Sequence, residues 1–134
     1  MKLGTALSAL ALVSGLAGNS HAAQTLVSPG FPTNTNTSGA CYLRNIGPRS
    51  VSVQVSALLN FSPGFITPDF ENCNDAPLAS GQTCVLLVND LPDDVTFECS
   101  ALVNGSAKNL RGNAELRAII PAGGARVILA DEMR

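Results

Sequence analysis

The chain has 134 residues, a formal net charge of −2, four cysteines and no tryptophan. This length suits one domain, and the small negative charge gives no electrostatic footprint for nucleic acid or an anionic membrane surface. Aromatic residues make up 4% of the sequence, so the core has to be built mainly from Val, Leu, Ile and Ala. A core of such small side chains would benefit from covalent cross-links.

The N-terminus has the features of a secretory signal peptide. Lys2 precedes an apolar stretch over residues 3–17, and Ser20 and Ala22 stand at the −3 and −1 positions of a cut after Ala22. A membrane anchor is the alternative, but a spanning helix needs about 20 predominantly apolar residues and flanking charges that are absent here. We therefore expect residues 1–22 to be removed, and the product to be secreted or periplasmic with no membrane attachment.

The first part of the exported chain is expected to precede the main domain. Within residues 23–39, Thr25–Val27 predicts a short edge strand, and Asn34–Gly39 is a polar tract without an apolar face. The tract predicts a loop of low order. The β-sandwich domain is then expected to span residues 40–134.

Two strands joined by a turn are predicted next. Residues 40–46 place Cys41, Leu43 and Asn45 on one face, and Val51–Leu59 has an apolar residue at every second position. The Gly-Pro pair between these segments is a turn signal. The sequence therefore predicts an antiparallel hairpin.

A long connection between sheets is predicted over residues 60–81, where prolines interrupt any alternation. Its first half holds four large apolar residues: Phe61, Phe65, Ile66 and Phe70. They have two interpretations, because they could cap the open end of the sandwich or form an exposed partner-binding loop.

Four further strands are predicted at residues 83–89, 95–103, 110–120 and 125–130, each apolar or alternating. Asn104 and Gly105 are the strongest hairpin signal in the chain, and they predict that the second and third of these strands pair with each other. About seven strands without a helix predict an all-β fold, an antiparallel β-sandwich of immunoglobulin-like type.

The four cysteines are expected to form two disulfides, as in other small exported domains. Four cysteines allow three connectivities, which the sequence alone cannot distinguish. We favour Cys41 with Cys99, because each lies on the apolar face of a predicted strand. We favour Cys73 with Cys84, because they flank an otherwise unsupported segment. A zinc site is the alternative, but its cysteines are usually two to four residues apart, and no two of these lie so close together.

Short motifs within residues 40–120 carry a resemblance to a known group of proteins. The motifs are a Cys-x-x-x-Asn-x-Gly pattern (Cys41, Asn45, Gly47), a Ser-Gly-Gln-Thr-Cys run (Ser80 to Cys84), the strand cysteine Cys99, and Leu110-Arg-Gly112. In these the chain resembles small exported bacterial disulfide-bonded β-sandwich proteins of immunoglobulin-like type, often without assigned function. The resemblance implies a cross-linked sandwich and carries no catalytic residue across. The chain departs from antibody-type domains because it has no tryptophan to pack on a bridge.

Removal of the signal peptide would also remove the only histidine, His21. Ser-His and Cys-His nucleophiles would then be impossible, and bridged cysteines are not nucleophiles. Paired carboxylates remain as a route to hydrolysis, at Asp93-Asp94 or at Asp69 and Glu71. Asp69, Glu71 and Asp75 are also candidates for binding calcium, which prefers oxygen ligands, although no Asp-x-Asp-x-Asp-Gly loop is present.

These patterns favour a non-enzymatic exported module with a structural, adhesive or binding role and no cofactor. Its partner is expected to be a protein or a carbohydrate, and an unpaired edge strand could also support self-association. Two alternatives stay open. One is a small secreted hydrolase that uses carboxylates, and the other is a secreted inhibitor or effector that acts through residues 60–81.

Overall fold

A computed structural model describes residues 22–59, 65–120 and 124–134 of the chain. Residues 1–21 of the predicted signal peptide, and Phe61 of the predicted partner-binding loop, lie outside these described residues. The described chain forms ten β-strands and one short 3₁₀ turn.

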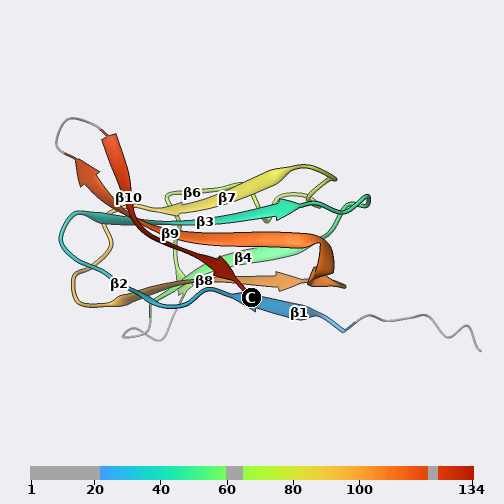
Figure 1. Cartoon of the computed structure of the whole chain (residues 1–134), viewed down its shortest axis with the longest axis horizontal. Helices are drawn as coiled ribbons and strands as arrows, with labels where there is room; N and C mark the ends of the chain where they lie inside the picture. The colour runs from blue at the N-terminus through green and yellow to red at the C-terminus, as the bar shows by residue number, and fades with distance from the viewer. Residues whose placement is uncertain (1–21, 60–64, 121–123) are drawn as a thin grey trace, which may run out of the picture.

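The strands form two antiparallel sheets that lie face to face as a sandwich (Figure 1). The first sheet contains β1 (Gln24–Val27), β2 (Phe31–Pro32), β8 (Thr96–Val103), β4 (Val53–Leu59) and β5 (Phe65–Ile66). Its order is β1-β8-β4-β5, and β2 also pairs with β8. The second sheet contains β10 (Gly124–Met133), β9 (Leu110–Ile120), β3 (Thr37–Asn45), β7 (Thr83–Val88) and β6 (Phe70–Glu71), in that order. The predicted all-β sandwich is confirmed.

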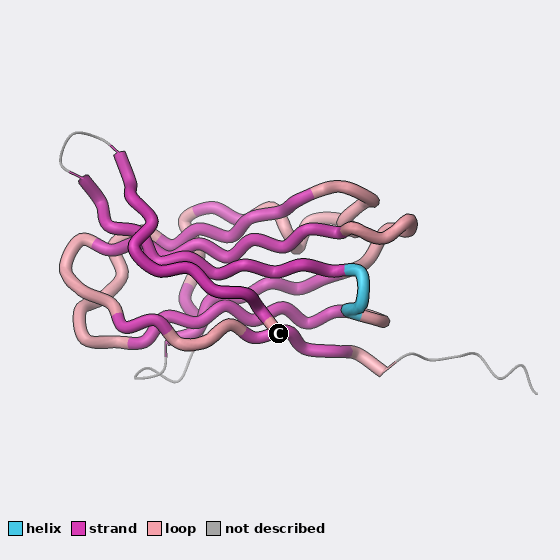
Figure 2. The backbone as a smooth tube through the Cα atoms, viewed as in Figure 1, coloured by secondary structure: helices cyan, strands magenta, loops and turns pink. Residues whose placement is uncertain are grey.

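The predicted strands all occur, as β1, β3, β4, β7, β8, β9 and β10. The strands that the sequence did not reveal, β2, β5 and β6, are each two residues long. Two residues cannot display an alternation of apolar and polar positions, so periodicity does not detect them. Figure 2 shows that the long strands run along both layers and that most of the loops lie at the two ends of the sandwich.

The core forms where the alternating faces of the two sheets meet. In β8, every second residue from Phe97 to Val103 is fully buried, and β3 buries Cys41 and Leu43 opposite it. Gly39 of β3 permits a close inter-sheet contact, because a Cβ at this position would lie 2.4 Å from Cζ of Phe97. Burial of these apolar faces holds the two layers together.

The predicted hairpin of residues 40–46 and 51–59 is wrong. β3 pairs with β7 and β9 in the second sheet, whereas β4 pairs with β8 and β5 in the first. Asn45, at the end of β3, is fully buried and holds the turn that leads the chain from the second sheet to the first. Its side-chain amide donates to the carbonyl oxygens of Arg49 and Leu78 at 2.7 and 2.9 Å. Its Oδ1 accepts from the N–H of Gly47 at 2.9 Å.

The Asn-Gly signal also fails to produce the predicted hairpin, because β8 and β9 belong to different sheets. The segment between them contains the 3₁₀ turn η1 (Ala107–Asn109), which Ser106 caps by accepting from the N–H of Lys108 at 3.3 Å. A two-residue loop would hold both strands in one sheet. This longer segment instead spans the two layers, which in sandwiches lie about 10 Å apart.

Residues 24–39 contribute strands to the sandwich rather than preceding it. β1 and β2 both pair with β8, and β3 begins at Thr37, inside the tract that was predicted to be a loop. Thr37 is buried although it is polar, because its hydroxyl donates to the carbonyl oxygen of Asn34 at 2.7 Å and its own carbonyl accepts from Leu91 at 2.9 Å. A polar residue that is satisfied in this way can occupy a buried strand position.

Both favoured disulfides are present. Cys41–Cys99 joins β3 to β8, and therefore joins the two sheets to each other, with 5.7 Å between its Cα atoms. Cys73–Cys84 joins the long connection to β7, with 5.0 Å between its Cα atoms. All four cysteines are buried. Disulfides of this kind are typical of proteins that reside in an oxidising compartment.

Candidate interaction surfaces

The far end of the β9–β10 hairpin carries five of the ten large hydrophobic side chains that are exposed among the described residues. These are Ile119, Ile120, Val127, Ile128 and Leu129, each 37–45% exposed, and we call them the apolar hairpin surface. Apolar residues that gather on an exposed surface are typical of a binding site.

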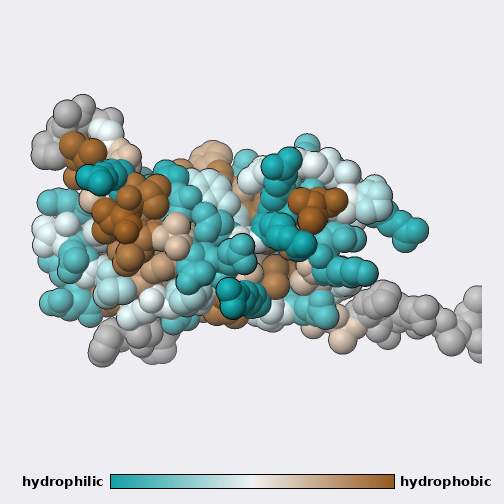
Figure 3. All heavy atoms as spheres, in the orientation of Figure 1, coloured by the Kyte–Doolittle hydropathy of each residue, from teal (hydrophilic) through white to brown (hydrophobic). Residues whose placement is uncertain are grey.

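The position of the hairpin explains this exposure. β9 buries every second residue from Leu110 to Leu116, but burial stops beyond that point. Among the described strands, β10 pairs with β9 alone, from Gly124 opposite Ile120 to Met133 opposite Gly112. Figure 1 shows that the end of the hairpin extends past the two layers, at the upper left. Figure 3 shows apolar surface gathered over the same region.

β10 is also an open edge of the second sheet. At its end, the N–H and C=O of Arg134 bond to Val27 of β1 at 3.0 and 2.8 Å. Backbone groups alternate in direction along an antiparallel strand, so Glu132 and Ala130 also direct their N–H and C=O groups away from β9. Within the described chain, no strand pairs with that side of β10.

Sequence reasoning found both strands of this hairpin but missed its surface. The signal that could have revealed it is the loss of alternation at Ile119-Ile120 and at Val127-Ile128-Leu129. Consecutive residues of a strand point to opposite faces, so these side chains cannot all face the core. A bulge between Val127 and Leu129 also leaves Ile128 without a partner in β9.

The predicted partner-binding loop does not form one patch. Phe65 of β5 lies opposite Leu58, on the outside of the first sheet, whereas Phe70 of β6 lies opposite Leu87, on the outside of the second. Ile66 is partly buried and contacts the core. Because Phe65 is 76% exposed and Phe70 is 50% exposed, these two phenylalanines do not cap the sandwich. They lie on opposite faces of it.

Of the carboxylates that were candidates for calcium or catalysis, Asp69 and Glu71 contact the backbone, whereas Asp93 and Asp94 are exposed and Asp93 accepts from the hydroxyl of Thr35 at 2.8 Å. Oδ2 of Asp69 accepts from the N–H of the residue after β7 at 2.6 Å, and Oε1 of Glu71 accepts from the N–H groups of Cys73 and Asn74. Asp75 is exposed. Among the residues that the structure describes, no group of three or more His, Cys, Asp or Glu could hold a metal ion. Asp69 and Glu71 therefore serve to fasten the long connection beside β7.

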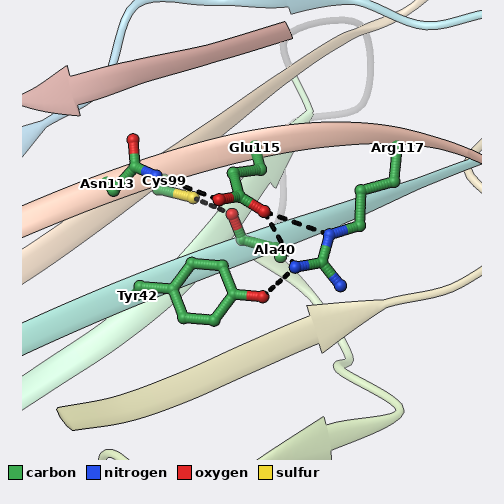
Figure 4. A network of polar contacts seen from close by, with 6 residues as sticks. All are labelled: Ala40, Tyr42, Cys99, Asn113, Glu115 and Arg117. Atoms are coloured by element: carbon green, nitrogen blue, oxygen red, sulfur yellow. Dashed lines mark hydrogen bonds and ion pairs between the residues drawn. The ribbon is translucent and has the colours of Figure 1, made fainter. Parts of the chain in front are cut away.

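A polar network occupies the outer face of the second sheet (Figure 4). Glu115 and Arg117 of β9 form an ion pair at 2.8 Å, and Arg117 also donates to the hydroxyl of Tyr42 on β3. The amide of Asn113 donates to Glu115 at 3.1 Å. The guanidinium carbon of Arg117 lies 5.5 Å from the centroid of the Tyr42 ring, which is a cation–π distance. A shallow hollow of about 530 Å³ lies beside this network. The side chains of the network bond to one another, and the hollow is also lined by Arg44, Thr83 and Glu132.

Comparison with protein-family models, with curated proteins and with solved structures found no match to this chain. The resemblance to small exported bacterial sandwich proteins therefore stays a prediction. In the described part of the chain, no helix has the length and apolar character to cross a membrane.

Proposed function

We propose that this chain is exported by the signal peptide of residues 1–22 and acts, in the periplasm or outside the cell, as a non-enzymatic protein-binding module. Its contact surface is the apolar hairpin surface. The observation that carries the proposal is that five large apolar side chains are exposed on one projecting hairpin, although the sandwich encloses a separate core of its own. The two disulfides support a location in an oxidising compartment.

Burial of the apolar hairpin surface can supply only part of the binding free energy. Complete burial of one large aliphatic side chain contributes about 1.5–3 kcal/mol. More than half of each side chain on the apolar hairpin surface is already covered, so roughly 1 kcal/mol per residue remains to be gained. Association also has to offset the loss of translational and rotational freedom. Backbone hydrogen bonds to the open edge of β10 are the second source of affinity that the hairpin offers.

The other hypotheses have less support. An effector acting through residues 60–81 would present Phe65 and Phe70 together, but these residues lie on opposite faces of the sandwich. A carboxylate hydrolase would need acids that face a cleft, whereas Asp69 and Glu71 bond to the backbone and Asp93 accepts from the hydroxyl of Thr35. For a carbohydrate partner, part of the polar surface beside the Tyr42 ring is already occupied, because Asn113, Glu115 and Arg117 bond to one another and to Tyr42.

Site-specific photo-crosslinking in the exporting cell tests the proposal. A benzophenone amino acid is placed at Val127 of the apolar hairpin surface, and in a second variant at Leu102. Leu102 is a matched control because it is apolar and 43% exposed, but it lies on the first sheet and away from the hairpin. We expect a discrete protein adduct from position 127 and none from position 102. Absence of an adduct at position 127, or equal adducts at both positions, would contradict the proposal.

A further inference from the structure

We infer that the partner of the apolar hairpin surface is a second copy of this chain, paired edge to edge through β10. The inference rests on the proposed function, because it names the occupant of the same surface. The two copies would extend the second sheet into one continuous antiparallel sheet that crosses the interface.

The length of the open edge is the first reason. β10 has ten residues and is exposed from Gly124 to Glu132. The edge strands at the opposite side of the sandwich, β5 and β6, have two residues each and offer few backbone groups. Natural proteins protect long edges with charges or proline, because such edges readily add another strand. Between Arg126 and Asp131 this edge has neither, and its residues are Val, Ile, Leu and Ala. Its one protective feature there is the bulge between Val127 and Leu129, beyond which β10 continues in regular register to Met133.

The charges on β10 are the second reason, because they are complementary to themselves. Arg126 lies toward the tip of the hairpin, and Asp131 and Glu132 lie toward its base. In an antiparallel pair of β10 strands, related by a two-fold axis near Leu129, Arg126 of each copy lies at the end of the contact where the other copy has Asp131 and Glu132. Asp131 shares a face of the sheet with Arg126, because their partners in β9, Ala114 and Ala118, lie on one face. A parallel pair would instead bring like charges together, which is unfavourable. The charges on β10 therefore favour the antiparallel pair.

This geometry predicts a closed dimer. In a dimer with a two-fold axis, β10 of one copy pairs with β10 of the other. Both β10 edges are then occupied, and a third copy has no β10 edge to pair with. Alternate residues such as Ala130 supply the backbone donors and acceptors, and Leu129 lies beside its own copy near the axis. The exposed valine, isoleucine and leucine side chains of each copy are then partly covered by the other.

Charge reversal tests the inference on the purified, oxidised protein. One variant carries Arg126→Glu, and another carries Asp131→Arg with Glu132→Arg. Each places like charges together at both ends of the pair, so we expect dimerisation to weaken roughly tenfold or more in sedimentation or light-scattering measurements. An equimolar mixture of the two variants restores opposite charges at both ends, and we expect a heterodimer. Arg49→Glu, at the turn after β3, is the control for net charge and should dimerise like the unmodified chain.

The outcomes separate this inference from the proposed function. An unmodified protein that stays monomeric at high concentration, or that forms an extended polymer, would contradict pairing through β10. Reversal variants that dimerise normally would contradict it as well. Circular dichroism and the mass of the disulfide-bonded chain verify that each variant is folded. If the protein is monomeric but photo-crosslinks from position 127 to a different protein, the self-pairing is wrong and the binding function stands.

Discussion

Asn45 shows how one buried polar side chain directs the chain after a strand. It is fully buried and makes three side-chain hydrogen bonds across the turn that leads from the second sheet to the first. The sequence placed Asn45 on the inner face together with Cys41 and Leu43, which is correct. It could not reveal the crossing, because the bonds to Arg49 and Leu78 depend on tertiary structure.

We predict that Asn45→Ala destabilises the fold by about 3 kcal/mol, because it leaves the N–H of Gly47 and the carbonyl oxygens of Arg49 and Leu78 without their partner. Urea denaturation followed by circular dichroism measures the free energy of unfolding. Asn104→Ala is the control, since Asn104 is exposed, and it should change this free energy by less than about 0.5 kcal/mol. Equal stability of the two variants would contradict the role given to Asn45.

Gly39 provides a steric test of the contact between the sheets. An added Cβ would lie 2.4 Å from Cζ of Phe97, whose side chain is fully buried and has no room to move away. We predict that Gly39→Ala destabilises the protein by about 2 kcal/mol through overpacking. At Gly124 an added Cβ meets no atom within 4 Å, so Gly124→Ala should be neutral or slightly stabilising. Thermal unfolding followed by circular dichroism measures the stability of both variants. A neutral result at Gly39 would mean that the two sheets lie further apart than described.

At the scale of elements, the sequence identified the strands much better than their partners. Alternation in Val53–Leu59 and Thr96–Val103 reports which face of a strand is buried, and the structure buries those faces. Alternation does not report which strand lies beside it, so both hairpins inferred from Gly-Pro and Asn-Gly signals are wrong. The apolar hairpin surface was missed for a related reason. The sequence predicted strands at residues 110–120 and 125–130, but it could not reveal that the end of this hairpin has no opposing sheet (Figure 1).

The two disulfides join different elements, and their removal should have different effects. In the chain-entropy model, the 58-residue separation of Cys41–Cys99 corresponds to about 4 kcal/mol, and the 11-residue separation of Cys73–Cys84 to about 3 kcal/mol. We therefore predict that replacing Cys41 and Cys99 by alanine lowers the melting temperature more than replacing Cys73 and Cys84. Scanning calorimetry of the two double variants measures the difference. The reverse order would mean that Cys41–Cys99 is not the main link between the sheets.

At the scale of the whole molecule, the residues that the structure describes form a cross-linked sandwich with one unprotected side. On the opposite side, the sheets end in β5 and β6, which are too short to add a partner strand. On the unprotected side, β10 combines a long open edge, apolar side chains and opposite charges at its two ends. Residue pattern predicted the sandwich, and it favoured, without distinguishing them from the alternatives, the cysteine pairs that the structure contains. The surface to which we assign the proposed function depends on where the first sheet ends, which is a property of the assembled fold.

Amide hydrogen exchange measured at increasing protein concentration tests most directly whether β10 is a binding edge. In the monomer, the N–H of Ala130 points away from β9 and should exchange rapidly, whereas amides in the central strand β8 exchange slowly at every concentration. We predict that protection across residues 126–132 increases as the protein is concentrated from low micromolar to near-millimolar, and that Arg126→Glu abolishes this increase. Protection of β10 that is the same at all concentrations, with the unmodified chain and the variant alike, would contradict the account.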